Sequence, residues 1–206
     1  MDNLLPTVFF HMRSRKLNED IIDLLPHYDY LDMLVTCRYL PEKAESMSAS
    51  LPVYYDFCRQ YGLDDASLAE LARKGTKELM TPALYILSEF ADELRGGAGA
   101  RDIYNASDFT SGTVCVCTNR SKMYGASLLY DKDVLCHLAA LFQESYHVVP
   151  SGIHEFLAVP LSCGQNVKYL ESTLHTLNAD EMSSVNILSE NVLYYNAENN
   201  TLTVCR

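Results

Sequence analysis

Short apolar segments, each closed by a proline, a glycine or a small polar residue, are the feature that most limits what this chain can fold into. Pro26, Pro41 and the Gly96-Gly97 pair each end such a segment. No apolar run approaches the ~18 residues that cross a membrane. Apolar residues still make up 48% of the chain, which is too many for a disordered coil. The pattern predicts a globular protein without internal repeats.

Hydrophobic periodicity predicts that strands and helices alternate along the chain. The expected strands cover 4–12, 31–40, 113–118, 125–130, 147–149, 153–159, 191–195 and 201–205. The expected helices cover 18–25, Asp64 or Asp65 to Leu79, Pro82 to Leu94, Asp131 to Phe142 and 165–177. We therefore expect an α+β fold, in which a mixed, largely antiparallel sheet packs against helices and the middle segment is helical.

Domain organisation follows from length and from one segment of biased composition. A chain of 206 residues suits a single compact domain over 1–206. Residues 96–112 are rich in glycine, alanine and serine, which is typical of a linker or mobile loop. If the chain forms two lobes, we expect them to be 1–95 and 113–206, joined by this flexible segment.

The charge of the chain restricts its partners. Sixteen lysines and arginines stand against 27 aspartates and glutamates, which gives a formal net charge of −11. The acidic excess is spread over both halves, with no basic patch. Nucleic acids and anionic membranes both attract clustered cations, so we expect neither as a partner.

Cysteine usage and the first residues indicate the compartment. Seven cysteines are an odd number for a disulfide framework, and most lie in apolar runs. The N-terminus lacks the basic region and the long apolar stretch of a signal peptide. We expect a cytoplasmic protein with free thiols. Cys115 and Cys117 are interpreted as buried strand thiols, because a lone C-x-C is weak for zinc, and no metal or cofactor is expected.

The most suggestive chemistry lies in the stretch PSGIHE. His154 could act as a general base or contact an anion, with Ser151 or Glu155 nearby. The structural alternative is that Ser151 caps a turn, His154 bonds within a sheet and Glu155 is solvated. Cys163 precedes a predicted helix, where a thiol pKa can fall, so it is a second candidate nucleophile.

Two further features suggest binding rather than catalysis. Arg120 and Lys122 lie in a predicted hairpin turn, where they would bind a phosphate or an acidic partner, or would only be solvated. The chain has 14 tyrosines and no tryptophan. Tyrosine is enriched at contact surfaces, although it also caps cores with its hydroxyl in water.

Four segments occur together in a recognisable order: 26–32, TNRSKMYGASLLY at 118–130, VVPSGIHE at 148–155 and LSENVLYYN at 188–196. In these segments the chain resembles an uncharacterised domain-of-unknown-function family of gut-associated bacteria and their mobile elements. The resemblance implies no catalytic residues. It also implies a shortened member that lacks the usual N-terminal portion, or whose missing lobe another chain supplies.

These observations lead to three hypotheses. The first is a non-catalytic binding module that engages a host protein or sequesters a small anionic ligand in a mobile-element context, through Arg120, Lys122, Ser151, His154 or Glu155. The alternative is a small hydrolase or transferase that uses His154 with Ser151, Glu155 or Cys163. The third is a self-assembling homo-oligomer.

Overall fold

The computed structural model describes residues 5–42, 44–107, 109, 112–181 and 183–205. The strands are β1 (Thr7–Ser14), β2 (Tyr28–Tyr30), β3 (Met33–Leu40), β4 (Leu51–Pro52), β5 (Pro82–Ile86), β6 (Cys115–Asn119), β7 (Tyr146–Val149), β8 (Phe156–Pro160), β9 (Leu193–Asn196) and β10 (Thr201–Val204). The α-helices are α1 (Tyr55–Tyr61), α2 (Asp65–Leu79), α3 (Leu87–Leu94), α4 (Lys132–Phe142) and α5 (Val167–Asp180). The 3₁₀ helices are η1 (Lys16–Asn18), η2 (Ile22–Leu24), η3 (Met47–Ala49), η4 (Gly125–Tyr130), η5 (Leu161–Cys163) and η6 (Ser184–Asn186).

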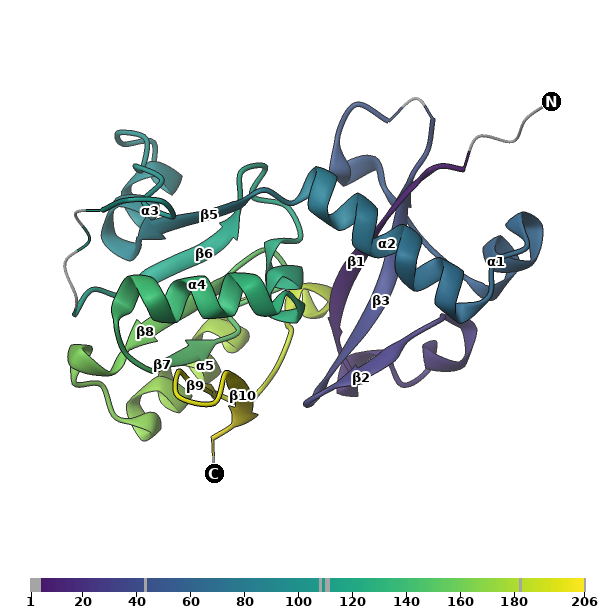
Figure 1. Ribbon diagram of the computed structural model, residues 1–206. Helices are drawn as coiled ribbons and strands as arrows, with labels where there is room; N and C mark the ends of the chain where they lie inside the picture. The colour runs from purple at the N-terminus through teal and green to yellow at the C-terminus, as the bar shows by residue number, and fades with distance from the viewer. Residues whose placement is uncertain (1–4, 43, 108, 110–111, 182, 206) are drawn as a thin grey trace.

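Two sheets lie side by side in the molecule, where the sequence predicts one (Figure 1). The first has the order β1-β3-β2, and β4 pairs with β3; the second has the order β10-β9-β7-β8-β6-β5. Every strand pair between described strands is antiparallel. The α+β class and the largely antiparallel pairing are therefore confirmed.

Helix α2 covers one face of the first sheet, and its start is the one that the sequence predicts. Asp64 is the N-cap, with a reciprocal capping box to Ser67. The Thr76 hydroxyl accepts a hydrogen bond of 2.9 Å from the Phe10 backbone N–H. A Cβ on Gly75 would lie 2.0 Å from the Val8 carbonyl oxygen, so only glycine allows the helix to approach β1 this closely.

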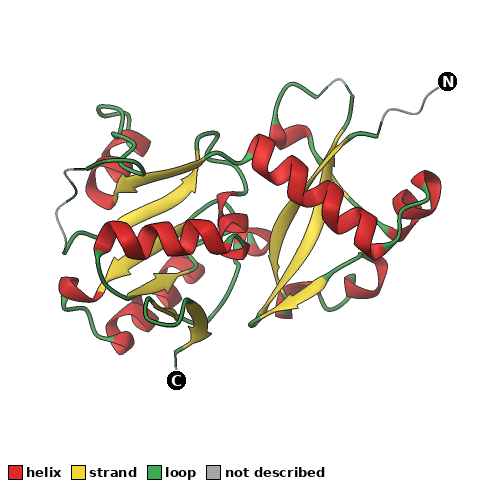
Figure 2. Cartoon of the chain, viewed as in Figure 1, coloured by secondary structure: helices red, strands yellow, loops and turns green. Residues whose placement is uncertain are grey.

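The second sheet has helices on both faces (Figure 2). Because successive strand residues point to opposite faces, Cys115 and Cys117 lie in the core with α4, whereas Val116 packs with α3. Helix α5 packs against Val149 and Val159 of β7 and β8. None of the helices in the described part of the chain is long and apolar enough to cross a membrane.

Three elements differ from the sequence prediction. The predicted helix over 18–25 is not formed: η1 ends at Asn18, and η2 covers only Ile22–Leu24. The predicted helix from Pro82 to Leu94 begins as strand β5, because 82–86 pair with β6 and tertiary pairing outweighs the helix-start signal of Thr81-Pro82. Residues 125–130 form η4 instead of a strand, because Gly125 packs directly against β6.

The expected linker does not lie between the two sheets. Helix α3 and strand β6 flank 96–112, and both belong to the second sheet or pack on it. The chain passes from the first sheet to the second between α2 and β5, at Met80 and Thr81. One cluster of buried apolar side chains extends across both sheets. The flexibility of 96–112 and the division into lobes remain predictions, and residues 108, 110 and 111 lie outside the described part.

Candidate functional site

Helix η4 and the residue before it contact β1 on both of its faces. Tyr124 contacts the Phe9 and His11 rings on one face of the strand, with ring centroids 6.2 and 4.9 Å away. Tyr130 contacts the Phe10 ring on the other face, at 5.3 Å. This arrangement, together with α2, whose Thr76 hydroxyl accepts a hydrogen bond from the Phe10 N–H, covers an edge strand that would otherwise be open to pairing. It also creates two polar regions at the junction of the sheets, one on each face of β1.

His154 lies in the first of these regions, and its hydrogen bonds hold one tautomer. The Tyr124 backbone N–H donates to His154 Nδ1 over 3.1 Å, and the Thr118 hydroxyl donates to the His154 carbonyl oxygen over 2.7 Å. Nδ1 is therefore an acceptor, and a second proton on the ring would oppose the Tyr124 donor. Burial lowers the pKa of His154, while Glu181 raises it. His154 is a neutral, positioned imidazole.

Ser151, Glu155 and Cys163 do not assemble a nucleophile and a base around His154. The Ser151 hydroxyl donates to the Glu155 carbonyl oxygen over 3.3 Å. Burial raises the pKa of Glu155, and the neighbouring carboxylate of Glu181 raises it further. Burial also raises the pKa of Cys163, contrary to an activated thiol. Among the described residues no hydrogen bond joins the His154 ring to any of these three side chains.

Arg120 and Lys122 follow β6, and each faces a carboxylate. The Lys122 ammonium group pairs with Glu93 and lies 5.0 Å from the centre of the Tyr85 ring. The Arg120 Nε atom lies 4.0 Å from an Asp102 oxygen. Because these cations are already compensated, this turn is a weaker anion site than the sequence suggests.

A second pair of cations, Arg13 of β1 and Arg38 of β3, has no such compensation. We call these two residues the arginine pair. The register places both arginines on the sheet face that points away from α2. Arg38 lies opposite Phe9, and Phe9 shares its face with Arg13, which is four residues farther along β1. The guanidinium carbon of Arg38 lies 4.9 Å from the centre of the Tyr124 ring.

The hydrogen bonds of the arginine pair go to neutral groups. Arg13 donates to the Asn18 side-chain oxygen over 3.0 Å, and its buried Nε has no partner among the described residues. Arg38 donates to the hydroxyl and the carbonyl oxygen of Ser50. In the described part of the chain neither arginine forms an ion pair. Burial lowers both pKa values, and Arg38 lowers that of Arg13 further.

His11 lies beneath the arginine pair and is only 3% exposed. Its Nε2 is buried and has no partner among the described residues. Burial holds the pKa of His11 well below 6.5, and Arg13, Arg38 and His154 lower it further. His11 is therefore neutral at pH 7, and its Nε2 is an unused polar atom beside two cations.

The sequence matches the Family of unknown function (DUF5688) over residues 1–197. The chain belongs to this family. The expected resemblance to an uncharacterised domain is thereby confirmed at the level of the family. Neither a curated protein nor a solved structure matches the chain. Membership of DUF5688 names no activity, so the argument for function depends on the side chains of the site.

In this DUF5688 chain two phenol groups also lie near the arginine pair. The phenols of Tyr54 and Tyr124 lie near enough to influence the pKa of both arginines, and no carboxylate does so. Guanidinium and phenol groups together form a set that recognises oxyanions, because carboxylates and phosphates accept several charge-assisted hydrogen bonds. The site can therefore bind an anion but holds no group poised for nucleophilic attack.

Sequence reasoning identified His154 but missed His11, Arg13 and Arg38. The signal was present, since His11 and Arg13 alternate with apolar residues in the first strand and share one face. Arg38 lies across the sheet from Phe9, and only the register of β1 and β3 shows that it shares the face of His11 and Arg13.

The cysteines supply no metal site in the described residues. Cys115 and Cys117 are buried and free, as the sequence predicts, and burial raises the pKa of Cys115 to about 12. No three histidine, cysteine, aspartate or glutamate side chains within the described ranges lie close enough together to hold a metal ion.

Proposed function

We propose that this protein is a non-catalytic binding module that captures a small oxyanion, a carboxylate or a phosphate, at the arginine pair. The observation that carries the proposal is the presence of two half-buried guanidinium groups on one sheet face without a carboxylate partner among the described residues. Removing cations from water is costly unless a counter-ion compensates them. A bound oxyanion provides that compensation.

The geometry around the pair supports an anion rather than a cation or a neutral sugar. Tyr124 is held at a left-handed backbone conformation (φ 58°), which is unusual for a bulky residue. In this conformation its ring lies against both Arg38 and His11. Positioning donors before the ligand arrives reduces the entropy that binding must overcome.

Binding of a protein partner has less support than binding of a small oxyanion. The most exposed large apolar side chains in the described chain, Leu94, Val185 and Tyr169, belong to three separate elements. The net charge of −11 supports the expectation that nucleic acid is not a ligand. We further propose that the module works in the cytoplasm in a mobile-element context.

Titration calorimetry with inorganic phosphate and with citrate at low ionic strength tests the proposal. We expect saturable binding of at least one of the two anions by the native chain. Arg13→Gln and Arg38→Gln should each weaken it about tenfold or more, because a charge-assisted hydrogen bond is worth about 1.5–3 kcal/mol. Added salt should weaken binding as well.

Arg120→Gln and Lys122→Gln are the matched controls, since they remove the same charge from compensated positions. Both should retain the affinity of the native chain. The proposal is overturned if neither anion binds, or if the control variants lose as much affinity as the variants of the arginine pair.

A further inference from the structure

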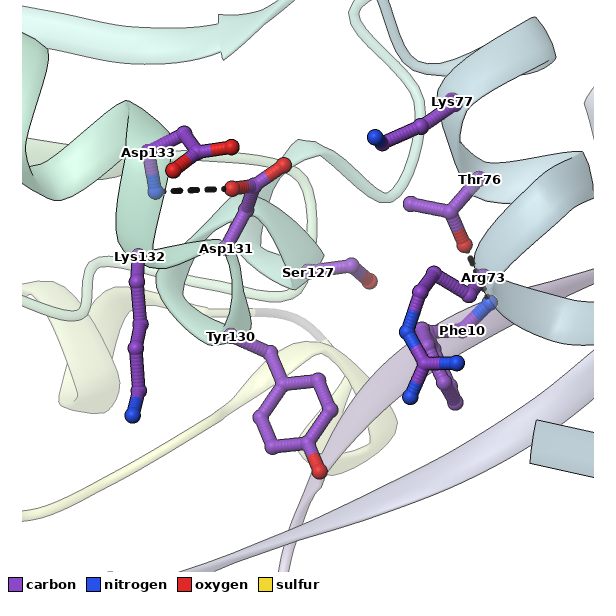
Figure 3. Close-up of a pocket in the computed structure, with 9 residues that line it drawn as sticks. All are labelled: Phe10, Arg73, Thr76, Lys77, Ser127, Tyr130, Asp131, Lys132 and Asp133. Atoms are coloured by element: carbon purple, nitrogen blue, oxygen red, sulfur yellow. Dashed lines mark hydrogen bonds between the residues drawn. The ribbon is translucent and has the colours of Figure 1, made fainter. Parts of the chain in front are cut away.

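A cavity of about 240 Å³ lies on the opposite face of β1, between α2 and the start of α4; we call it the junction pocket (Figure 3). Both sheets contribute to it, because Phe10 and α2 belong to the first and η4 and α4 to the second. It is smaller than the ~300–1,000 Å³ pockets of drug-sized ligands, so its volume suits only a small ligand.

The two walls of the junction pocket carry opposite charges. Arg73 and Lys77, one helical turn apart, form the α2 wall, and Asp131 and Asp133 form the α4 wall. No ion pair joins the two walls within the described part of the chain. In Figure 3 the Lys77 ammonium group points toward the α4 wall, whereas Lys132 extends away from it. The facing charges are thus separated by space that a ligand can enter.

The floor combines one unused hydroxyl with two aromatic rings. Ser127 is 2% exposed, and its Oγ has no hydrogen-bond partner among the described residues. Figure 3 shows this hydroxyl directed toward the α2 wall. The rings of Phe10 and Tyr130 meet edge to face below it. A buried hydroxyl without a partner is costly, and a ligand atom at this position would satisfy it.

We propose that the junction pocket binds a free α-amino acid with an apolar side chain. The ligand carboxylate accepts hydrogen bonds from Lys77, whose ammonium group faces the α4 wall, and the ligand ammonium group donates to Asp131. The Arg73 guanidinium lies beside Phe10 and adds positive charge to the α2 wall (Figure 3). The Ser127 hydroxyl donates to the carboxylate, and the apolar side chain packs on the two rings. This site is separate from the arginine pair, and it differs in requiring a positive group on the ligand.

Thermal unfolding and titration calorimetry with L-leucine, L-valine and L-phenylalanine test this assignment. We expect saturable binding of at least one of them, with a higher midpoint of unfolding because the ligand contacts both sheets. The N-acetyl derivative and the amide of the same amino acid should bind at least about tenfold more weakly, since each removes one charge. Equal binding of either derivative, or no binding by all three amino acids, overturns the proposal.

Substitutions of the charged residues on the two walls test whether the amino acid binds in the junction pocket. Lys77→Gln and the double variant Asp131→Asn/Asp133→Asn should each weaken binding about tenfold, and asparagine at 131 keeps the N-cap of α4. Lys74→Gln is the matched control, because Lys74 is exposed on the same helix but does not line the pocket. Arg38→Gln should leave amino-acid binding unchanged. This variant therefore distinguishes failure of the amino-acid site from failure of the oxyanion site. Equal losses in the Lys74 and Lys77 variants would contradict the assignment.

Discussion

The arginine pair of the first sheet and the Arg120–Lys122 turn beside the second sheet differ in what compensates their charge. In the turn, Glu93 and Asp102 face the two cations, and Lys122 also lies over two aromatic rings. The arginine pair has only neutral oxygens and phenols around it, and each arginine is partly buried. The charges of the turn are compensated within the described chain, whereas those of the pair are not, and the proposed oxyanion would compensate them.

This difference shows that exposure in a turn is a poor guide to ligand binding. A surface cation of an acidic protein finds a carboxylate easily, as Lys122 does. A cation held on a sheet face cannot move to find one, and under the proposed function an anion supplies the compensation. Functional sites often carry such local instability, which the rest of the fold must support.

The largest expected effect comes from the contact that positions Tyr124 and His154 beside the arginine pair. A Cβ on Gly125 would lie 2.3 Å from the Thr118 hydroxyl oxygen and 2.6 Å from the His154 carbonyl oxygen. We expect Gly125→Ala to lower the free energy of unfolding by about 3 kcal/mol, measured by urea denaturation. Gly99→Ala is the control, because no atom lies within 4 Å of its Cβ position, and it should change stability by less than about 0.5 kcal/mol. Similar stability in both variants would mean that Gly125 does not position the site.

A smaller expected effect is the dependence of the free energy of unfolding on pH, through the buried histidine beneath the arginine pair. His11 has a lowered pKa in the folded chain. Below pH 6.5 its imidazole is therefore protonated in the unfolded chain but stays neutral in the folded chain. Stability should therefore fall as the pH falls, by more than about 1 kcal/mol between pH 7 and pH 5. Glu155 acts in the opposite direction, since its raised pKa favours the folded state in acid.

Denaturant unfolding of the variant His11→Gln over the same pH range measures the histidine contribution. The slope of stability against pH should become flatter in this variant. His175→Gln, which changes an exposed histidine of α5, should keep the slope of the native chain. A slope that is equal in all three proteins would show that the buried histidine is not linked to folding.

The smallest effect compares the two basic pairs directly. Lys122→Met removes the cation–π contacts to Tyr85 and Phe90, and it should lower the free energy of unfolding by about 1 kcal/mol. Arg13→Met removes no ion pair; it loses the hydrogen bond to Asn18 but relieves repulsion from Arg38, so without added anion the two effects should offset and change stability by less than about 0.5 kcal/mol. Urea denaturation of both variants gives the two values. If Arg13→Met costs more than Lys122→Met, the arginine pair is structural.

Local signals explain which elements the sequence predicts correctly. The start of α2 at Asp64, the cap of α4 at Asp131 and the closing hairpin β9–β10 depend on neighbouring residues, and the structure confirms all three. The same signals are wrong for 82–86 and 125–130. There a partner strand and the close packing of Gly125 decide the conformation, and neither is visible within a short window.

The sequence by itself determined the α+β class, the free buried thiols, the acidic charge and His154 as a residue of interest. These properties depend on composition, alternation and capping, which act over a few residues. The tertiary structure alone decided which cations are compensated and which are not. The register of β1 and β3 places Arg38 opposite Phe9, on the same sheet face as Arg13 four residues farther along β1, and packing across the junction places Tyr124 and His154 there. Charge compensation depends on the distance between charges in space. Arg13 and Arg38 are 25 positions apart in sequence, so whether they are compensated can be judged only after the strands have paired.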